Sequence, residues 1–154
     1  MTTSTDFASL PLSPEQLRNL DELGYQAMRP IQALSLPPIL EGKDVLGQAE
    51  TGSGKTLAFG LGIMQIINPR FFGAQAIVLC PTRELADQVA KELRKLARAL
   101  GNIKVLTLCG GQALRPQIES LQHGAHVIVG TPGRVLDLVR EQHRNLSQVK
   151  VFVL

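Results

Sequence analysis

Short apolar runs alternate with helical patterns along most of this sequence of 154 residues. The runs are rich in Val, Ile and Leu, which is typical of strands buried on both faces of a parallel sheet. The clearest helical pattern, over residues 83–100, has apolar side chains on one side and charged ones on the other, as expected of an amphipathic helix. This alternation predicts an α/β fold with a doubly wound, mostly parallel sheet flanked by helices in three α/β/α layers. The expected strands are 44–49, 76–81, 104–109, 126–130 and 149–154, and the expected helices after the first four are 55–67, 83–100, 114–122 and 134–142.

Helical signals of a different kind precede the first expected strand. Ser13 is followed by Pro14, a pair typical of an N-cap and the first helical position. Pro30 can begin a second helix, and Gly42 can end it. We therefore expect residues 1–43 to form a helical cap and residues 44–154 to form the α/β part of one structural domain.

Composition excludes several classes of protein. Two cysteines are too few for a disulfide scaffold, and no apolar run approaches the roughly 20 residues of a membrane-spanning helix. The N-terminus has no basic segment followed by an apolar one, so no signal peptide is predicted. We therefore expect a cytoplasmic, monomeric protein without a membrane partner.

The net charge of +3 is unevenly distributed. Residues 1–77 contain five basic and seven acidic side chains, whereas residues 78–154 contain 11 basic and six acidic ones. The basic second half favours contact with phosphate groups, although solvated helix faces also produce such a bias.

The stretch AETGSGKT, which begins at Ala49, matches the phosphate-binding loop pattern except that alanine replaces its first glycine. Gly52 and Gly54 allow a tight turn that aims backbone N–H groups at phosphate oxygens. Lys55 can reach the β- and γ-phosphates, and the Thr56 hydroxyl can ligate Mg²⁺. A glycine-rich turn without a ligand is the weaker alternative, so the stretch predicts a nucleoside triphosphate site.

The stretch GYQAMRPIQ, residues 24–32, can supply contacts to the base. The side-chain amide of Gln32 offers a donor and an acceptor, which suits bidentate pairing with adenine. Tyr25 could stack on the ring. From these residues alone, a turn with a core aromatic is the favoured alternative.

Several short motifs occur in a fixed order: AETGSGKT, PTRELA at 81–86, the pair Gly110-Gly111, and TPGR at 131–134. Together with GYQAMRPIQ, which resembles an adenine-reading Q motif, and the isolated Phe7, they resemble the first RecA-like domain of DEAD-box RNA helicases. The resemblance extends from Phe7 to Leu154. The runs ADQVAKELRKLARAL and LTLCGGQ are most similar to the bacterial DbpA branch of that family.

The resemblance implies the ATP-binding part of an enzyme that couples ATP hydrolysis to local unwinding or remodelling of RNA duplexes. ATP and Mg²⁺ would be its cofactors and RNA its partner, with ribosomal RNA as a candidate target. Lys55 and Thr56 would have catalytic roles, with Thr56 as the Mg²⁺ ligand. The nucleotide site would comprise Phe7, Tyr25, Gln32, Ala49, Glu50, Thr51, Gly52, Ser53, Gly54, Lys55 and Thr56. A single-stranded RNA track would comprise Pro81, Thr82, Arg83, Glu84, Gly110, Gly111, Thr131, Pro132, Gly133 and Arg134.

The residues of the proposed track also have a simpler interpretation. Each group follows an expected strand, and ligand sites in open α/β sheets lie at the carboxyl ends of strands. Without the family pattern, however, helix capping by Thr82 and Thr131 and a helix start at Pro132 would be favoured.

The sequence departs from the DEAD-box pattern in three ways. Arg29 stands where a small polar residue is common, and Met28 replaces a frequent proline. The sequence also ends at Leu154, before the acidic motif, so we expect residues 1–154 alone to bind nucleotide without hydrolysing it. A related phosphate-loop NTPase or DNA translocase, and a non-catalytic nucleotide-binding module, are the alternative functions.

The remaining polar and sulfur groups receive structural interpretations. Cys80 and Cys109 end expected neighbouring strands and are interpreted as small buried residues rather than metal ligands or a disulfide. The three histidines, His123, His126 and His143, have no metal-ligand spacing and are assigned to turns and surfaces. The basic cluster over residues 94–98 is expected to be a solvated helix face.

Overall fold

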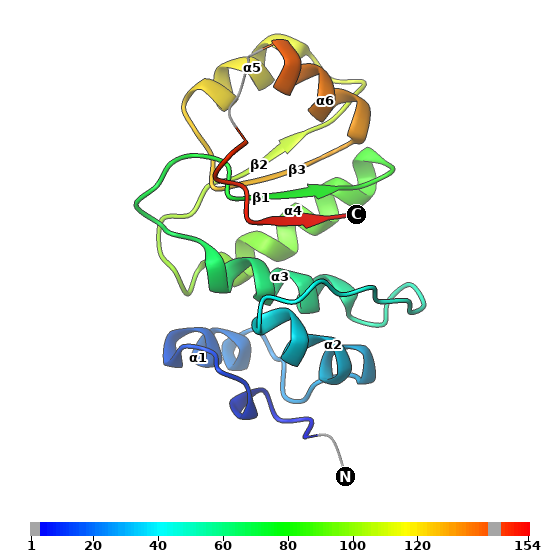
Figure 1. The fold of residues 1–154 in the computed structure, drawn as a ribbon, viewed down its shortest axis with the longest axis vertical. Helices are drawn as coiled ribbons and strands as arrows, with labels where there is room; N and C mark the ends of the chain where they lie inside the picture. Colours follow the sequence, from blue (N-terminus) through cyan, green and yellow to red (C-terminus); the bar gives the residue numbers. More distant parts are fainter. Residues whose placement is uncertain (1–3, 142–145) are drawn as a thin grey trace. The chain divides into compact units, whose positions relative to one another are not determined.

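The computed structural model describes residues 4–141 and 146–154 of the chain (Figure 1). These residues form two compact units. The first contains the described residues up to Ile66 together with Lys95–Gly101, and the second contains Ile67–Arg94 and the described residues from Asn102 to Leu154. The division expected at residue 43 lies inside the first unit and stays a prediction.

The first unit is helical. The Ser13 hydroxyl accepts a hydrogen bond from the Gln16 N–H at 3.1 Å and caps the first helix, as the sequence predicts. Gly62 allows the second and third helices to pack closely, since a side chain there would collide with Ile39. The elements of this unit are a short 3-10 turn, Phe7–Ser9, and the helices α1 (Pro14–Glu22), α2 (Pro30–Leu40) and α3 (Lys55–Ile66).

Residues 95–101 belong to the first unit through contacts with α1. The Gln16 side-chain amide donates to the Leu96 carbonyl at 3.2 Å, and the Asn19 amide donates to the Lys95 carbonyl at 3.0 Å. Both amides are buried, and a buried polar group without a partner is costly. These bonds therefore fix α1 to that segment.

The strand expected over residues 44–49 does not form, and this prediction was wrong. The segment has no strand structure, and Leu46 is fully exposed. Its residues belong to the first unit, which contains no strand among its described residues. A strand needs a neighbour for its backbone N–H and C=O groups, so the apolar run alone was not sufficient.

The second unit contains a parallel four-stranded sheet in the order β2-β3-β1-β4. Its strands confirm the other four expected runs, although each is shorter than the apolar run that predicted it. In the register of the sheet, Leu79 and Leu108 both pair with Gly130, so β1, β3 and β2 end side by side. The strands are β1 (Ala76–Leu79), β2 (Val105–Leu108), β3 (Val127–Gly130) and β4 (Val151–Val153).

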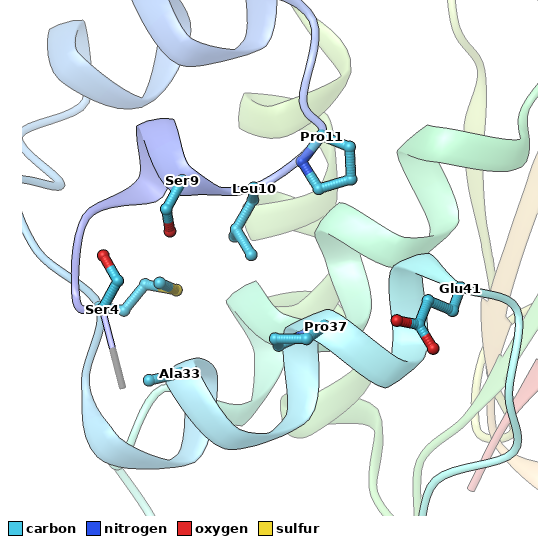
Figure 2. Close-up of a pocket in the computed structure, with 8 residues that line it drawn as sticks. Ser4, Ser9, Leu10, Pro11, Ala33, Pro37 and Glu41 are labelled. Carbon is cyan, nitrogen blue, oxygen red and sulfur yellow. The ribbon is translucent and has the colours of Figure 1, made fainter. Parts of the chain in front are cut away.

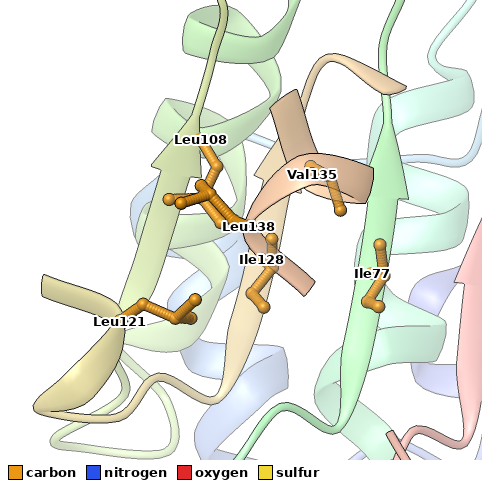
Figure 3. Packing of buried hydrophobic residues seen from close by; sticks show 6 residues of the cluster. All are labelled: Ile77, Leu108, Leu121, Ile128, Val135 and Leu138. Carbon is orange, nitrogen blue, oxygen red and sulfur yellow. The ribbon is translucent and has the colours of Figure 1, made fainter. Parts of the chain in front are cut away.

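Helices lie on both sides of this sheet, which confirms the predicted doubly wound α/β architecture. The helices α5 (Leu114–Gln122) and α6 (Pro132–Glu141) lie on one side of the sheet (Figure 1). Helix α4 (Arg83–Ala97) lies on the other side, and its residues up to Arg94 belong to this unit. Side chains from the sheet, α5 and α6 form a buried apolar core (Figure 3): Ile77, Leu108, Leu121, Ile128, Val135 and Leu138. None of the described helices is long and apolar enough to cross a membrane.

His126 lies in the connection between α5 and β3 but is fully buried, so its assignment to the surface was wrong. Its Nδ1 accepts a hydrogen bond from the Lys104 N–H at 3.0 Å, and its Nε2 lies 2.9 Å from the Pro69 carbonyl oxygen. A carbonyl only accepts, so Nε2 holds the proton and donates it. His123 is exposed after α5, as expected, whereas His143 lies outside the described residues.

Candidate functional site

The phosphate-loop stretch forms a tight turn that leads into α3. Gly52 and Gly54 have φ values of +83° and +97°, a left-handed conformation that strongly favours glycine. The helix begins at Lys55, so its unpaired N–H groups and positive dipole end face the loop. The Lys55 ammonium donates to the Ala49 carbonyl at 2.6 Å, which draws this side chain back across its own loop.

The Q-like stretch contacts the phosphate loop directly. The Gln32 side-chain oxygen accepts from the Arg29 N–H at 2.9 Å, and its amide nitrogen donates to the Gly54 carbonyl at 3.1 Å. The Arg29 guanidinium donates to the Gly52 carbonyl. A side chain at Gly54 would collide with the Gln32 amide. The left-handed φ of +97° is the main reason for glycine at position 54, and a side chain there would also displace the Gln32 amide.

Gln32 retains part of its bonding capacity. A glutamine amide has two donor hydrogens and two acceptor lone pairs, and the two bonds above use one of each. The remaining donor and acceptor are the pair that the adenine edge requires. Gln32 is 3% exposed, so a base can reach this amide only if the residues that cover it move.

Phe7 and Tyr25 lie together, apart from Gln32. They line a shallow pocket of about 240 Å³ to which Asp6, Leu17 and Gln26 also contribute. A second hollow of about 230 Å³ lies between the N-terminal segment and α2 (Figure 2). Neither pocket includes the phosphate loop or Gln32, so a shared base site for Phe7, Tyr25 and Gln32 stays a prediction.

Two hydroxyl groups of the phosphate loop are suited to a phosphate and its metal ion. The Ser53 hydroxyl is buried and has no hydrogen-bond partner within the described chain, which is costly unless a ligand satisfies it. Thr56 follows in the first turn of α3 and is half-buried. Mg²⁺ commonly takes only one or two protein oxygens and keeps water and phosphate ligands. The residues present therefore fit a phosphate-bound Mg²⁺, although the described part of the chain contains no cluster of three His, Cys, Asp or Glu side chains that could hold a metal alone.

The residues of the expected RNA track lie at one edge of the sheet in the second unit. Pro81 follows β1, Gly110 follows β2 and Thr131 follows β3, and these three strands end in register. A side chain at Gly130 would collide with the Leu108 carbonyl, so this glycine lets the strand ends approach closely. Of the ten track residues, eight are exposed and two, Thr131 and Arg134, are half-buried.

The two threonines of the track have different roles. The Thr82 hydroxyl accepts from the Leu85 N–H at 3.2 Å and caps α4, as the simpler interpretation predicted. The Thr131 hydroxyl instead accepts from the Gly110 N–H at 3.0 Å and so links the loop after β2 to the start of α6. Glu84 lies in the first turn of α4, where its carboxylate complements the helix dipole.

Two arginines place positive charge near the end of β2. Burial raises the pKa of the Cys109 thiol and the Asp87 carboxylate raises it further, while a hydrogen bond with Thr131 and the charges of Arg83 and Arg134 lower it. Both guanidinium groups therefore lie close enough to the Cys109 thiol to lower its pKa. A planar, charged guanidinium group can donate two hydrogen bonds to the oxygens of one phosphate.

The cysteines are buried and free, as expected. Burial, and then the neighbouring Cys109, raise the pKa of the Cys80 thiol. The strands that precede them, β1 and β2, are not neighbours, because β3 lies between them. Two strand spacings amount to about 9.6 Å, which is too far for a disulfide.

Sequence reasoning missed Gln112 and Gln117, which contact a residue of the expected track. The Arg134 guanidinium donates to the Gln112 carbonyl at 3.1 Å and to the Gln117 side-chain oxygen at 3.0 Å. Gln117 is 7% exposed and stands four residues before the buried Leu121. A polar residue in the apolar stripe of a helix was the signal that could have identified it.

Comparisons with known proteins establish the family of the chain. The sequence profile described as DEAD/DEAH box helicase matches residues 29–154, which is more than half of the chain. The chain belongs to the DEAD/DEAH box helicase family. Its fold is therefore RecA-like, as the motifs implied.

Two curated relatives of this DEAD/DEAH box chain are bacterial. It is 58% identical over 151 residues to the ATP-dependent RNA helicase DbpA of Escherichia coli (strain K12), covering 97% of this chain and 33% of that protein. It is 44% identical over 150 residues to the DEAD-box ATP-dependent RNA helicase CshA of Geobacillus kaustophilus (strain HTA426), covering 97% of this chain and 32% of that protein. The chain thus spans about a third of the length of these relatives.

Solved structures agree with this assignment. A crystal structure of a DEAD box protein from Methanococcus jannaschii has a TM-score of 0.89 and 39% identity, covering 96% of this chain and 40% of that one. The Saccharomyces cerevisiae protein Dbp5, bound to RNA and ADP BeF3, has a TM-score of 0.82 and 32% identity, covering 97% of this chain and 37% of that one.

Proposed function

We propose that this chain is the ATP-binding and RNA-contacting part of a DEAD-box RNA helicase, an enzyme that couples ATP hydrolysis to local unwinding or remodelling of RNA duplexes. The observation that carries the proposal is the joined phosphate loop and Q-like stretch, in which Gln32 bonds Gly54 at 3.1 Å. The names of the relatives support it, since DbpA and CshA are both called ATP-dependent RNA helicases.

The nucleotide site uses residues of the first unit. Lys55 leaves the Ala49 carbonyl and reaches the phosphates, while the backbone N–H groups at the start of α3 bind phosphate oxygens. The Thr56 hydroxyl is the protein ligand of Mg²⁺, which neutralises phosphate charge when it is bound. Gln32 uses its spare donor and acceptor to select adenine. Phe7 and Tyr25 line a different pocket and reach the base by moving towards it.

The RNA site uses the exposed strand ends of the second unit. Arg83 and Arg134 provide charged donors for the backbone phosphates of single-stranded RNA, and Gly110, Gly111 and Gly133 allow the RNA backbone to approach closely. The structure of Dbp5 with RNA and ADP BeF3 supports an RNA ligand for this fold. Ribosomal RNA as the target, a monomeric state and a cytoplasmic location are further parts of this proposal.

Replacing Lys55 by alanine tests the phosphate-loop assignment. We expect the Lys55→Ala chain to bind a fluorescent ADP analogue at least about tenfold more weakly, because a charge-assisted bond to phosphate is lost. Lys43→Ala is the matched control, since Lys43 is exposed and pairs with Glu41 at 2.8 Å. Equal affinities of the Lys55→Ala and unaltered chains, measured by fluorescence titration, would show that the loop does not hold the phosphates.

The expected lack of hydrolysis by residues 1–154 alone stays a prediction. It is checked with the same preparation by measuring phosphate release from ATP with and without RNA. Turnover stimulated by RNA would contradict it.

A further inference from the structure

A buried glutamine on α5 joins the two loops that carry Gly110 and Arg134. Gln117 is 7% exposed, while its neighbours in the first turn of α5, from Leu114 to Pro116, are exposed. Burial of an amide is costly unless its polar atoms are hydrogen-bonded. The bonds of Gln117 therefore explain why a polar side chain is tolerated here.

Both ends of the Gln117 amide are bonded. Its Nε2 donates to the Cys109 carbonyl at 3.0 Å and to the Gln112 side-chain oxygen at 3.2 Å, and its Oε1 accepts from Arg134 at 3.0 Å. A carbonyl can only accept and a guanidinium can only donate. The amide therefore has one possible orientation, with its oxygen towards Arg134.

This arrangement fixes the Arg134 guanidinium. Its Nη1 atom donates to Gln117 and to the Gln112 carbonyl, which occupies both hydrogens on that nitrogen. A guanidinium has five N–H donors. The other three, on Nη2 and Nε, have no acceptor within the described residues and remain for a ligand.

The same network fixes the loop after β2. The Cys109 carbonyl, the Gln112 side chain and the Gly110 N–H are held by Gln117 and Thr131. Hydrogen bonds from Gln117 on α5 hold the loop after β2. The bond between Gly110 and Thr131 joins that loop to the start of α6. A phosphate site gains affinity when its donors are ordered before the ligand arrives.

We propose that Gln117 is a positioning residue for the RNA surface, which orients Arg134 and the Gly110–Gly111 loop towards the RNA backbone. The inference rests on the proposed RNA function of that surface. Gln117 does not contact RNA itself, because its side chain is buried and three of the four hydrogen-bonding positions of its amide are used within the chain.

Replacing Gln117 by leucine tests this inference. The change keeps the volume of the side chain but removes its hydrogen bonds. We expect the Gln117→Leu chain to bind a labelled single-stranded oligouridylate about three- to tenfold more weakly by fluorescence anisotropy at low salt, with unchanged affinity for ADP. Gln122→Leu is the matched control, since Gln122 is an exposed glutamine on the same helix.

A double-mutant cycle separates positioning from general loss of structure. Arg134→Ala should weaken RNA binding by about tenfold and reduce the slope of log K against log salt by about 0.7. If Gln117 acts through Arg134, adding Gln117→Leu to Arg134→Ala should weaken binding little further. Fully additive losses, or an unchanged affinity of Gln117→Leu, would overturn the proposal.

Hydrogen exchange gives a measurement that does not depend on RNA. The Gln117→Leu chain should take up deuterium faster over residues 110–113 than the unaltered chain, while strand β1 keeps its protection. Unchanged exchange over 110–113 would contradict the positioning role. If the unaltered chain binds no RNA, the proposed RNA function fails, and the exchange result still decides whether Gln117 orders the loop.

Discussion

Arg29 differs from the small polar residue that is common at this position in the DEAD-box pattern, and the structure gives it two contacts. Its backbone N–H donates to the Gln32 side chain, and its guanidinium donates to the Gly52 carbonyl. The guanidinium is therefore joined to the phosphate loop. At the position where the family pattern commonly has a small polar residue, the structure shows a charged link to the phosphate loop.

Arg29→Thr should weaken ADP binding by about three- to tenfold. The substitution removes a positive charge beside the phosphate loop and one bond to its backbone, a loss of about 1 kcal/mol. Isothermal titration at low and high salt measures the effect, which should shrink at high salt because screening weakens charge interactions. Arg18→Thr is the control, since Arg18 is exposed and pairs only loosely with Glu15 at 3.9 Å. Equal or tighter binding by Arg29→Thr would show that the guanidinium does not assist the nucleotide.

His126→Ala should destabilise the second unit. The change leaves the Lys104 N–H and the Pro69 carbonyl without their partner and opens a cavity beside Phe72, whose ring centroid lies 4.8 Å from that of His126. We expect a loss of about 2–4 kcal/mol in the free energy of unfolding, measured by urea denaturation. His123→Ala, at an exposed site in the same connection between α5 and β3, should change it by less than about 0.5 kcal/mol. A similar small effect for His126→Ala would mean that the buried ring contributes little.

The roles of single residues were predictable where the signal is local. Ser13 and Thr82 cap helices as the sequence predicts, because a cap depends on residues two or three positions away. His126 and Gln117 were missed, because their partners lie in other elements and are set by tertiary packing. The adenine role of Gln32 stays a prediction.

At the scale of elements, apolar runs predicted four of the five expected strands. Those four runs pair with one another in the second unit. The run over 44–49 has similar composition but no strand partner in the described chain, so it forms no strand and is largely exposed. Periodicity indicates which residues can be buried, but strand formation also depends on a neighbour that periodicity does not identify.

The order of strands was not predicted by the sequence. The chain places β3 between β1 and β2, which separates two cysteines assigned to neighbouring strands. This order also brings Pro81, Gly110 and Thr131 to one edge. The motifs implied that these residues share a ligand, whereas the sheet provides the physical reason for their proximity.

At the scale of the whole molecule, the two candidate ligand sites belong to different compact units. The phosphate loop and Gln32 lie in the first, and the strand ends proposed to contact RNA lie in the second. The charge distribution follows a similar division, since the acidic half of the sequence contains the nucleotide motifs and the basic half contains the RNA motifs. Each site can therefore be tested by substitutions within its own unit.

The most direct test of the account compares ADP with GDP as ligands of this chain, by isothermal titration with Mg²⁺ present. We predict that ADP binds at least about tenfold more tightly, because a bidentate contact from Gln32 discriminates between bases by about 1–3 kcal/mol. Gln32→Leu should reduce this preference, and it should also weaken the binding of both nucleotides because it removes the bond to the Gly54 carbonyl of the phosphate loop. Equal affinity for ADP and GDP, or no binding of either, would contradict the proposal that the chain holds an adenine nucleotide.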